Sequence, residues 1–138
     1  MGWHLTSYGY ASDLLDRLKT VTPTGGGSTT IDYNDAGRTV SVTQAAGGLC
    51  SSSASIVTKT QFDGLGRAFI QGVKSGATWN ITKSRLDGLG RVTGVWVPYL
   101  ESSAPGGLSS TAYDELGRPT SATSPAGAQQ KWVYEQTV

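Results

Sequence analysis

Charge, cysteine and histidine are scarce in this chain. Of its 138 residues only 15% are charged, the formal net charge is +1, and there is one cysteine and one histidine. A single cysteine, Cys50, excludes an internal disulfide and any metal site built from several thiolates. The basic residues are scattered singly, so there is no basic patch of the kind that nucleic acids or anionic membranes require. We therefore expect no nucleic-acid partner, no metal ion and no cofactor.

Long apolar runs are also missing. No window approaches the run of about 18 apolar residues that a membrane-spanning helix needs. The first residues, MGWHLTSYGYASD, lack the basic segment and apolar run of a secretory signal. We expect no membrane span and no signal peptide in this chain.

Glycine, serine and threonine are abundant instead. The 19 glycines favour many short turns over long helices. The length suits one domain, spanning residues 1–138, with enough apolar residues for a moderate core.

A six-residue signature occurs five times. It consists of an aromatic or large apolar residue, Asp or Asn, two variable residues, Gly and Arg. The copies stand at unequal intervals, which is typical of one structural unit repeated with connections of different length. They occupy residues 12–17, 33–38, 62–67, 86–91 and 113–118.

The signature has the chemistry of a β-turn. Asp or Asn at the first turn position accepts a backbone N–H two residues on, and Gly at the fourth takes a left-handed conformation that closes a hairpin loop. Asn34 is expected to make the same bond as Asp, and Asp16, which replaces Gly, tolerates positive φ. The predicted turn residues are Asp13, Asp16, Arg17, Asn34, Gly37, Arg38, Asp63, Gly66, Arg67, Asp87, Gly90, Arg91, Asp114, Gly117 and Arg118. For the first copy a short helix capped by Ser12 is the alternative, and we favour the turn.

Segments rich in Val, Ile, Thr and aromatic residues flank the signatures, as strands do. Clusters of Gly, Pro and Ser separate one pair of strands from the next. We predict an all-β fold of consecutive antiparallel β-hairpins, with about ten strands in one long twisted, curling sheet. The signature turns would lie along one rim and the clusters along the other. The expected strands are residues 29–33, 38–44, 55–62, 67–73, 78–86, 91–99, 109–113 and 118–123.

Alternation within the strands predicts two unlike faces. Val40 and Val42 fall on one face, with Thr and Ser on the other, so we expect one packed face and one polar face. Both edges of such a sheet would be open. The last residues, WVYEQTV (132–138), have the pattern of the rising strand of a sixth copy. We expect a fragment of a larger repeat protein.

We predict that the repeated Asp and Arg have a structural role. Their turns would lie about 10 Å apart along the rim, whereas a catalytic site needs its groups in contact. We predict cross-strand cation–π pairs within each hairpin, worth about 0.5–1 kcal/mol each. These pairs are Tyr33 with Arg38, Phe62 with Arg67, and Tyr113 with Arg118.

Two further kinds of site find little support. One carboxylate per turn cannot supply the six or so oxygens that Ca²⁺ prefers. His4 and Cys50 are the one Cys–His pair available for nucleophilic catalysis, and nothing in the sequence orients them. We predict no catalytic residue.

Aromatic residues are the remaining candidates for binding. Trp79, Trp96 and Tyr99, with Trp132 and Tyr134, stand at strand positions, where aromatic side chains usually fill a core or bridge neighbouring strands. The alternative is a surface platform for sugars or protein partners, built on Trp79, Trp96 and Tyr99.

The motif Tyr-Asp-x-x-Gly-Arg resembles the YD repeat of the RHS family. The resemblance covers about residues 8 to 134, and residues 87–127 are especially similar to the RHS segments of bacterial insecticidal toxin complex subunits. It implies a β-sheet strip that spirals into a hollow shell around a toxic polypeptide; animal teneurins use a similar shell. The family's self-cleaving core motif, built on paired Asp-Pro-x-Gly sequences, is missing, and SPAG (124–127) is a distant echo of it.

The resemblance implies a structural role without enzymatic activity. The chain would be a wall segment of a secreted or cell-surface shell. Its partners would be the neighbouring YD repeats of the parent chain and an enclosed toxin or effector polypeptide. The alternative is a recognition module that binds glycans or a cell-surface partner.

Overall fold

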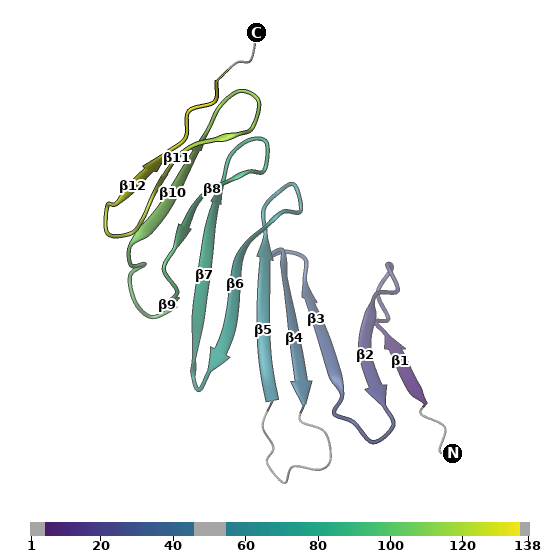
Figure 1. Cartoon of the computed structure of the whole chain (residues 1–138). Coiled ribbons are helices and arrows are strands. Elements are labelled where there is room, and N and C mark those ends of the chain that lie inside the picture. The colour runs from purple at the N-terminus through teal and green to yellow at the C-terminus, as the bar shows by residue number, and fades with distance from the viewer. Residues whose placement is uncertain (1–4, 46–54, 136–138) are drawn as a thin grey trace.

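The fold is all-β, as predicted. The computed structural model describes residues 5–45 and 55–135, so His4 and Cys50 lie outside the described residues. The described residues form strands and turns without any helix (Figure 1). None of them, therefore, belongs to a helix of the length and hydropathy needed to cross a membrane. The strands are β1 (Thr6–Tyr10), β2 (Leu18–Pro23), β3 (Thr29–Asn34), β4 (Thr39–Ala45), β5 (Ser55–Phe62), β6 (Ala68–Ser75), β7 (Thr78–Leu86), β8 (Val92–Trp96), β9 (Tyr99–Leu100), β10 (Leu108–Tyr113), β11 (Pro119–Thr123) and β12 (Gln129–Lys131).

The strands form one antiparallel sheet in which spatial order follows chain order. The sheet has 12 strands, and every strand from β1 to β12 pairs with its neighbours in sequence except β9, which pairs with β7. All pairs are antiparallel. This arrangement matches the predicted succession of hairpins.

The two kinds of connection lie on opposite margins of the sheet. The five signature turns join β1 to β2, β3 to β4, β5 to β6, β7 to β8, and β10 to β11. Figure 1 shows these turns along the upper margin, which we call the signature rim, and the described connections between β2 and β3 and between β6 and β7 along the lower margin. The repeat therefore places five similar turns in one row.

One predicted strand is broken in two. A single strand was expected over residues 91–99, but β8 ends at Trp96 and β9 begins at Tyr99. The Val97 N–H donates to the Gly107 carbonyl at 2.9 Å, which lies beside β10, and Pro98 has no N–H to offer. The chain then crosses over, so that Tyr99 pairs with Ile81 on the other half of β7.

The sheet is one layer thick and has almost no core. Ile81, at 4% exposure, is the one buried large hydrophobic residue among those described. A compact monomer of this mass would expose about 6,800 Å², whereas this chain of 14.4 kDa exposes 9897 Å². The prediction of a moderate core is therefore wrong, because the alternating pattern indicates which side chains share a face but not whether a second layer covers it.

The most buried point lies on the face opposite to the expected one. Val40 and Val42 pair with Tyr33 and Ile31, and directly paired residues share a face. Ile81 lies on the other face, where it pairs with Gly72. A Cβ at Gly72 would stand 3.0 Å from the Ile81 side chain, so this glycine makes room for Ile81.

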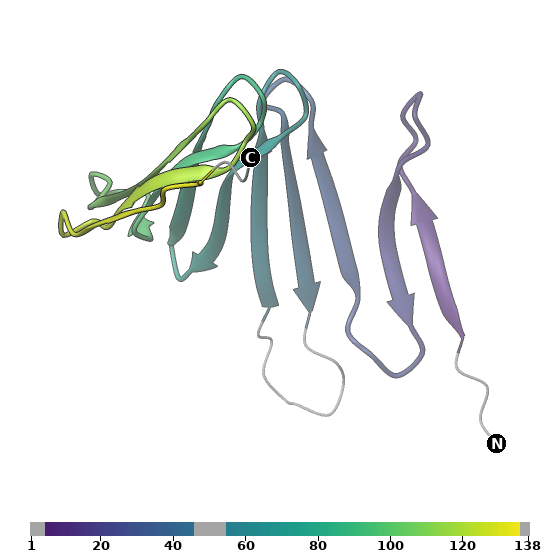
Figure 2. The same ribbon diagram turned by 45° about the horizontal axis from the view of Figure 1, so that its top comes forward.

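The strip curls along its length. Between the two views, the strands β3, β4 and β5 keep nearly one plane, whereas β8, β10, β11 and β12 turn away from it (Figures 1 and 2). Accumulated right-handed twist produces this shape in a long open sheet.

Candidate functional site

The three C-terminal signature turns are built identically. In the turn after β5, Asp63 Oδ1 accepts the N–H groups of Leu65 at 2.9 Å and Arg67 at 3.0 Å. Its Oδ2 accepts the Arg67 Nε–H at 2.7 Å. Asp87 and Asp114 repeat all three bonds with the residues two and four positions on. One carboxylate thus fixes both the turn and the arginine that ends it.

The turn glycines have the left-handed conformation that the spacing predicts. Gly66, Gly90 and Gly117 have φ of 76°, 85° and 81°. Each donates its N–H to the carbonyl of the turn Asp. A residue with a Cβ is strained at such φ values, which accounts for Gly at this place in the signature.

A β-bulge follows each of these turns. The pairing register shifts between Gln61 and Phe62, and the same shift recurs in the next two signature hairpins. The residue two places after the arginine is left without a direct partner: Phe69, Thr93 and Thr120 in the three hairpins. A bulge bends the strand and re-aims its side chains.

Two of the three regular arginines also hold the next turn along the rim. Arg67 Nη1 donates to the Asp87 carbonyl at 3.1 Å, and Arg91 Nη1 donates to the Asp114 carbonyl at 3.2 Å. A Cβ built at Gly90 would stand 3.3 Å from the Arg67 side chain, so the arginine lies across that glycine. We call this contact the arginine clasp.

At three places a tyrosine ring lies against the arginine of the preceding signature. The Arg91 guanidinium lies 4.9 Å from the Tyr113 ring centroid, and the Tyr113 hydroxyl donates to the Val92 carbonyl at 2.9 Å. Arg17 with Tyr33 and Arg118 with Tyr134 have the same geometry, with ring distances of 4.3 Å. Tyr134 thus takes the aromatic position of a sixth copy.

The predicted cation–π pairs within each hairpin are wrong. Arg17, not Arg38, lies over Tyr33, and Arg91, not Arg118, lies over Tyr113. Among the described residues Phe62 has no cation over its ring. The reason is that each regular arginine is held by the Asp of its own turn, and its guanidinium then extends over the following hairpin.

The first signature is a turn and not a helix. Asp16 has a φ of 46° and donates its N–H to the Asp13 carbonyl. Asp13 accepts from Leu15 and Arg17, as in the regular turns. Arg17 then reaches the second turn, where it bonds both oxygens of Asp35 at 2.6 and 2.9 Å.

The second signature departs from the prediction. Arg38, with a φ of 49°, is the left-handed residue, whereas Gly37 is not. Asn34 Oδ1 accepts the N–H of Gly37 three residues on, and Arg38 donates its N–H to the Asp35 carbonyl. An amide carries no charge to hold the Arg38 guanidinium, and Asp35 is already paired with Arg17. The turn has therefore moved along by one residue.

The turn carboxylates are engaged in hydrogen bonds with the arginines of the signature turns. The side-chain bond from Arg91 is the main cause of a lowered pKa for Asp87, and the backbone N–H of Arg67 is the main cause for Asp63. The pKa of Asp13, Asp35 and Asp114 is lowered in the same way by Arg17 and Arg118. In residues 5–45 and 55–135, no three Asp, Glu, His or Cys residues are grouped to hold a metal ion. The carboxylates of the signature rim therefore hold the backbone of the turns in place.

The three candidate platform aromatics lie on the same face of the sheet. Tyr99 pairs with Ile81, and Trp79 stands two residues before Ile81 on β7. The Lys59 ammonium lies 4.5 Å from the Trp79 ring, and that of Lys83 lies 5.4 Å from the Trp96 ring. The two indoles therefore already carry a cation on one side.

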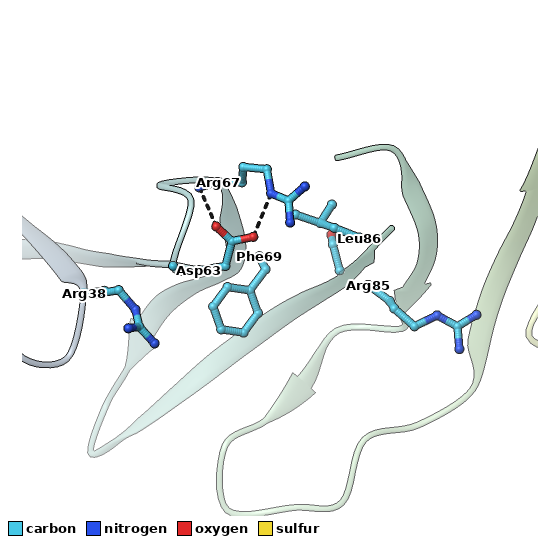
Figure 3. A pocket seen from close by; sticks show the side chains of 8 residues that line it. Arg38, Asp63, Arg67, Phe69, Arg85 and Leu86 are labelled. Carbon is cyan, nitrogen blue, oxygen red and sulfur yellow. Dashed lines mark hydrogen bonds and ion pairs between the residues drawn. The ribbon is translucent and has the colours of Figure 1, made fainter. Parts of the chain in front are cut away.

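A pocket of about 340 Å³ opens near the signature rim at the third hairpin. Figure 3 shows the Phe69 ring between Arg38 and Leu86, below the Asp63–Arg67 ion pair. The sequence did not single out Phe69, Arg85 or Leu86 as site residues. Their signal is a break in the repeat, since Leu86 stands where three of the other four copies have an aromatic residue. The full lining is Arg38, Asp63, Gly64, Arg67, Phe69, Ser84, Arg85 and Leu86.

Comparison with protein-family models and with curated proteins found no match to this chain.

Proposed function

We propose that this chain is a wall segment of an RHS-type shell that encloses a toxin or effector polypeptide and has no catalysis of its own. The observation that carries this proposal is a sheet of 12 strands, one layer thick, in which arginines link successive turns of the rim. An independent domain stabilises itself by packing layers, whereas a wall must be continuous and thin. The resemblance of the signature to the YD repeat adds the enclosed polypeptide and a secreted or cell-surface location.

Open ends fit the same function. β1 and β12 each pair on one side within the described residues, so each leaves a row of backbone groups free. Such edges are a ready template for another strand. The natural occupants are neighbouring YD repeats of the parent chain, which would extend the same rim.

Protection from protease tests the proposal on the complete gene product. If the repeats form a wall, the polypeptide encoded with them resists digestion while the wall is intact. Arg91→Gln, which removes one clasp, is expected to admit protease, whereas Arg85→Gln, an equal loss of charge away from the clasps, is expected to leave protection unchanged. Digestion of that polypeptide at the same rate in the unmodified protein as in its isolated form would refute enclosure.

A second candidate function is recognition of glycans or a cell-surface partner. It is favoured by the common face of Trp79, Trp96 and Tyr99, since aromatic rings beside polar groups suit sugars. Tyr99 also lines a pocket of about 220 Å³ with Lys59 and Glu101. Binding on a glycan array that Trp96→Ala abolishes would support this function, and binding that survives the substitution would count against it.

A further inference from the structure

The pocket of Figure 3 lies where the repeat is broken in three ways. At this junction the arginine of one hairpin lacks its clasp, the next hairpin carries an aromatic bulge residue, and the hairpin after that lacks its tyrosine. The residues concerned are Arg38, Phe69 and Leu86, and all three line the same cavity.

Arg38 makes no clasp, although a signature turn follows it along the rim. Its Nε donates to the Phe62 carbonyl at 3.3 Å, and among the described residues its two terminal nitrogens make no hydrogen bond. Arg17, Arg67 and Arg91 instead use a terminal nitrogen to bind the following turn. Nothing lies within 4 Å of a Cβ built at Gly66, where the regular pattern would place Arg38. The shifted second turn thus leaves a planar donor group facing open space.

Leu86 and Phe69 account for the cavity and its apolar wall. Tyr113 and Tyr134 lie against the preceding arginine with their rings, but Leu86 occupies the equivalent position next to Arg67 and carries no ring. Phe69 is the bulge residue, whose counterparts are Thr93 and Thr120. The space left is about 340 Å³, within the range of about 300–1,000 Å³ found for small-ligand sites.

The electrostatics of the cavity favour an anion. Arg38, Arg67 and Arg85 line it together with the single carboxylate of Asp63, and both Asp63 oxygens are bonded to Arg67. The Arg85 guanidinium points away from Phe69 in Figure 3, and its Nε bonds the Thr93 hydroxyl at 3.3 Å. Arg38 is therefore the group with two free donors in the fork geometry that matches a carboxylate.

We propose that this pocket binds a carboxylate attached to an apolar group. The Arg38 guanidinium holds the carboxylate, and Phe69 and Leu86 contact the apolar part. A free aryl or alkyl carboxylic acid and an acidic residue beside an apolar one in a polypeptide share this chemistry. The site does not depend on the proposed shell, because it is formed by hairpins within this chain.

Binding of 3-phenylpropionate to the 138-residue chain tests the site, measured by NMR shifts of the Arg38 side-chain N–H and the Phe69 ring. Saturable shifts of both groups are expected. The uncharged amide of the same acid should bind at least about tenfold more weakly, because a charge-assisted pair is lost. The peptide N-acetyl-Phe-Glu-amide separates the sources: tighter binding than 3-phenylpropionate indicates a polypeptide ligand, and weaker binding a free acid.

Three variants locate the site. Arg38→Gln should reduce affinity at least about tenfold, and Lys74→Gln, with the same change of charge at the opposite end of β6 from Phe69, should leave it within about twofold. Leu86→Tyr restores the repeat and fills the cavity, so it should remove binding while the chain stays folded. Binding that is unchanged by Leu86→Tyr, equal loss in the Arg38→Gln and Lys74→Gln variants, or equal affinity for acid and amide would each overturn the proposal.

Discussion

The hairpins from β5 to β11 and those from β1 to β4 use the same signature with different results. In the C-terminal group, Asp63, Asp87 and Asp114 each bind the arginine four residues on. In the N-terminal group Asp13 also binds Arg17, but this first turn is longer, since Ala11 rather than Asp13 donates to the Arg17 carbonyl. The second turn is displaced by one residue.

The difference shows what one charge does in this fold. Where Asp stands first in the turn, it fixes the glycine, the bulge and the direction of the arginine together. Where Asn34 stands there, the glycine loses its left-handed conformation, the register of β3 and β4 has no shift, and Arg38 is released. The break in regularity and the pocket beside Phe69 have the same origin.

Substitutions of the turn glycines should reveal the contribution of the arginine clasp to stability most strongly. Gly66→Ala is expected to cost about 1–2 kcal/mol from backbone strain alone, because nothing lies near its Cβ. Gly90→Ala has the same strain and also meets the Arg67 side chain at 3.3 Å, so its loss should be larger. Urea unfolding measures both, with Gly64→Ala as a control, because its Cβ also meets nothing within 4 Å. Equal losses at Gly66 and Gly90 would mean that the clasp adds nothing.

The substitution Asn34→Asp should make the second turn resemble the regular turns of the C-terminal half. Asn34→Asp supplies the missing carboxylate, so Gly37 should become left-handed and Arg38 should bond the new Asp. Relief of the positive φ at Arg38 is expected to stabilise the chain by about 1 kcal/mol. An NMR structure of the variant checks the turn, and 3-phenylpropionate titration should show weaker binding because Arg38 is now occupied. An unchanged turn would show that Arg17–Asp35, and not the amide, sets its conformation.

Removing one hydroxyl should have a smaller effect. Tyr113→Phe keeps the ring beneath Arg91 and loses the bond to the Val92 carbonyl, at a cost of about 0.5–1 kcal/mol. Phe62 has no preceding clasp, so Phe62→Tyr should gain less than this amount. Thermal unfolding of the pair gives the comparison, and a gain at Phe62 equal to the loss at Tyr113 would show that the hydroxyl acts without the arginine.

Acid should loosen the signature turns that contain a paired carboxylate. The pKa of the turn carboxyls is lowered in the folded state, so their contribution is complete above the unfolded value of 3.8 and is lost as the pH falls through the lowered folded value. Hydrogen exchange in the turns after β5, β7 and β10 should therefore accelerate below that pH. The turn between β11 and β12 has Ser124 in place of Asp, and acceleration there by the same factor would point to a general loss of the sheet.

The local part of this structure follows from sequence, and the contacts between hairpins do not. The conformations of Gly66, Gly90 and Gly117 are properties of four consecutive residues, so the spacing predicts them. The hydrogen bond from Arg67 to the Asp87 carbonyl depends on the bulge and on the position of the next hairpin. That hairpin lies outside any short stretch of sequence around Arg67.

The face that Ile81 occupies depends on tertiary structure in the same way. Its burial requires Gly72 on the neighbouring strand and the return of the chain at Tyr99. The alternation around Val40 indicates an apolar face without indicating what packs on it.

Amide exchange in Arg91→Gln tests most directly whether one arginine holds two successive turns. Arg91 bonds Asp87 in its own turn and the Asp114 carbonyl in the next. The amides of Gly90 and Gly117 should both exchange faster in this variant, with Arg85→Gln leaving both unchanged. Faster exchange at Gly90 alone would contradict the account, since it would mean that each turn is held by its own arginine only.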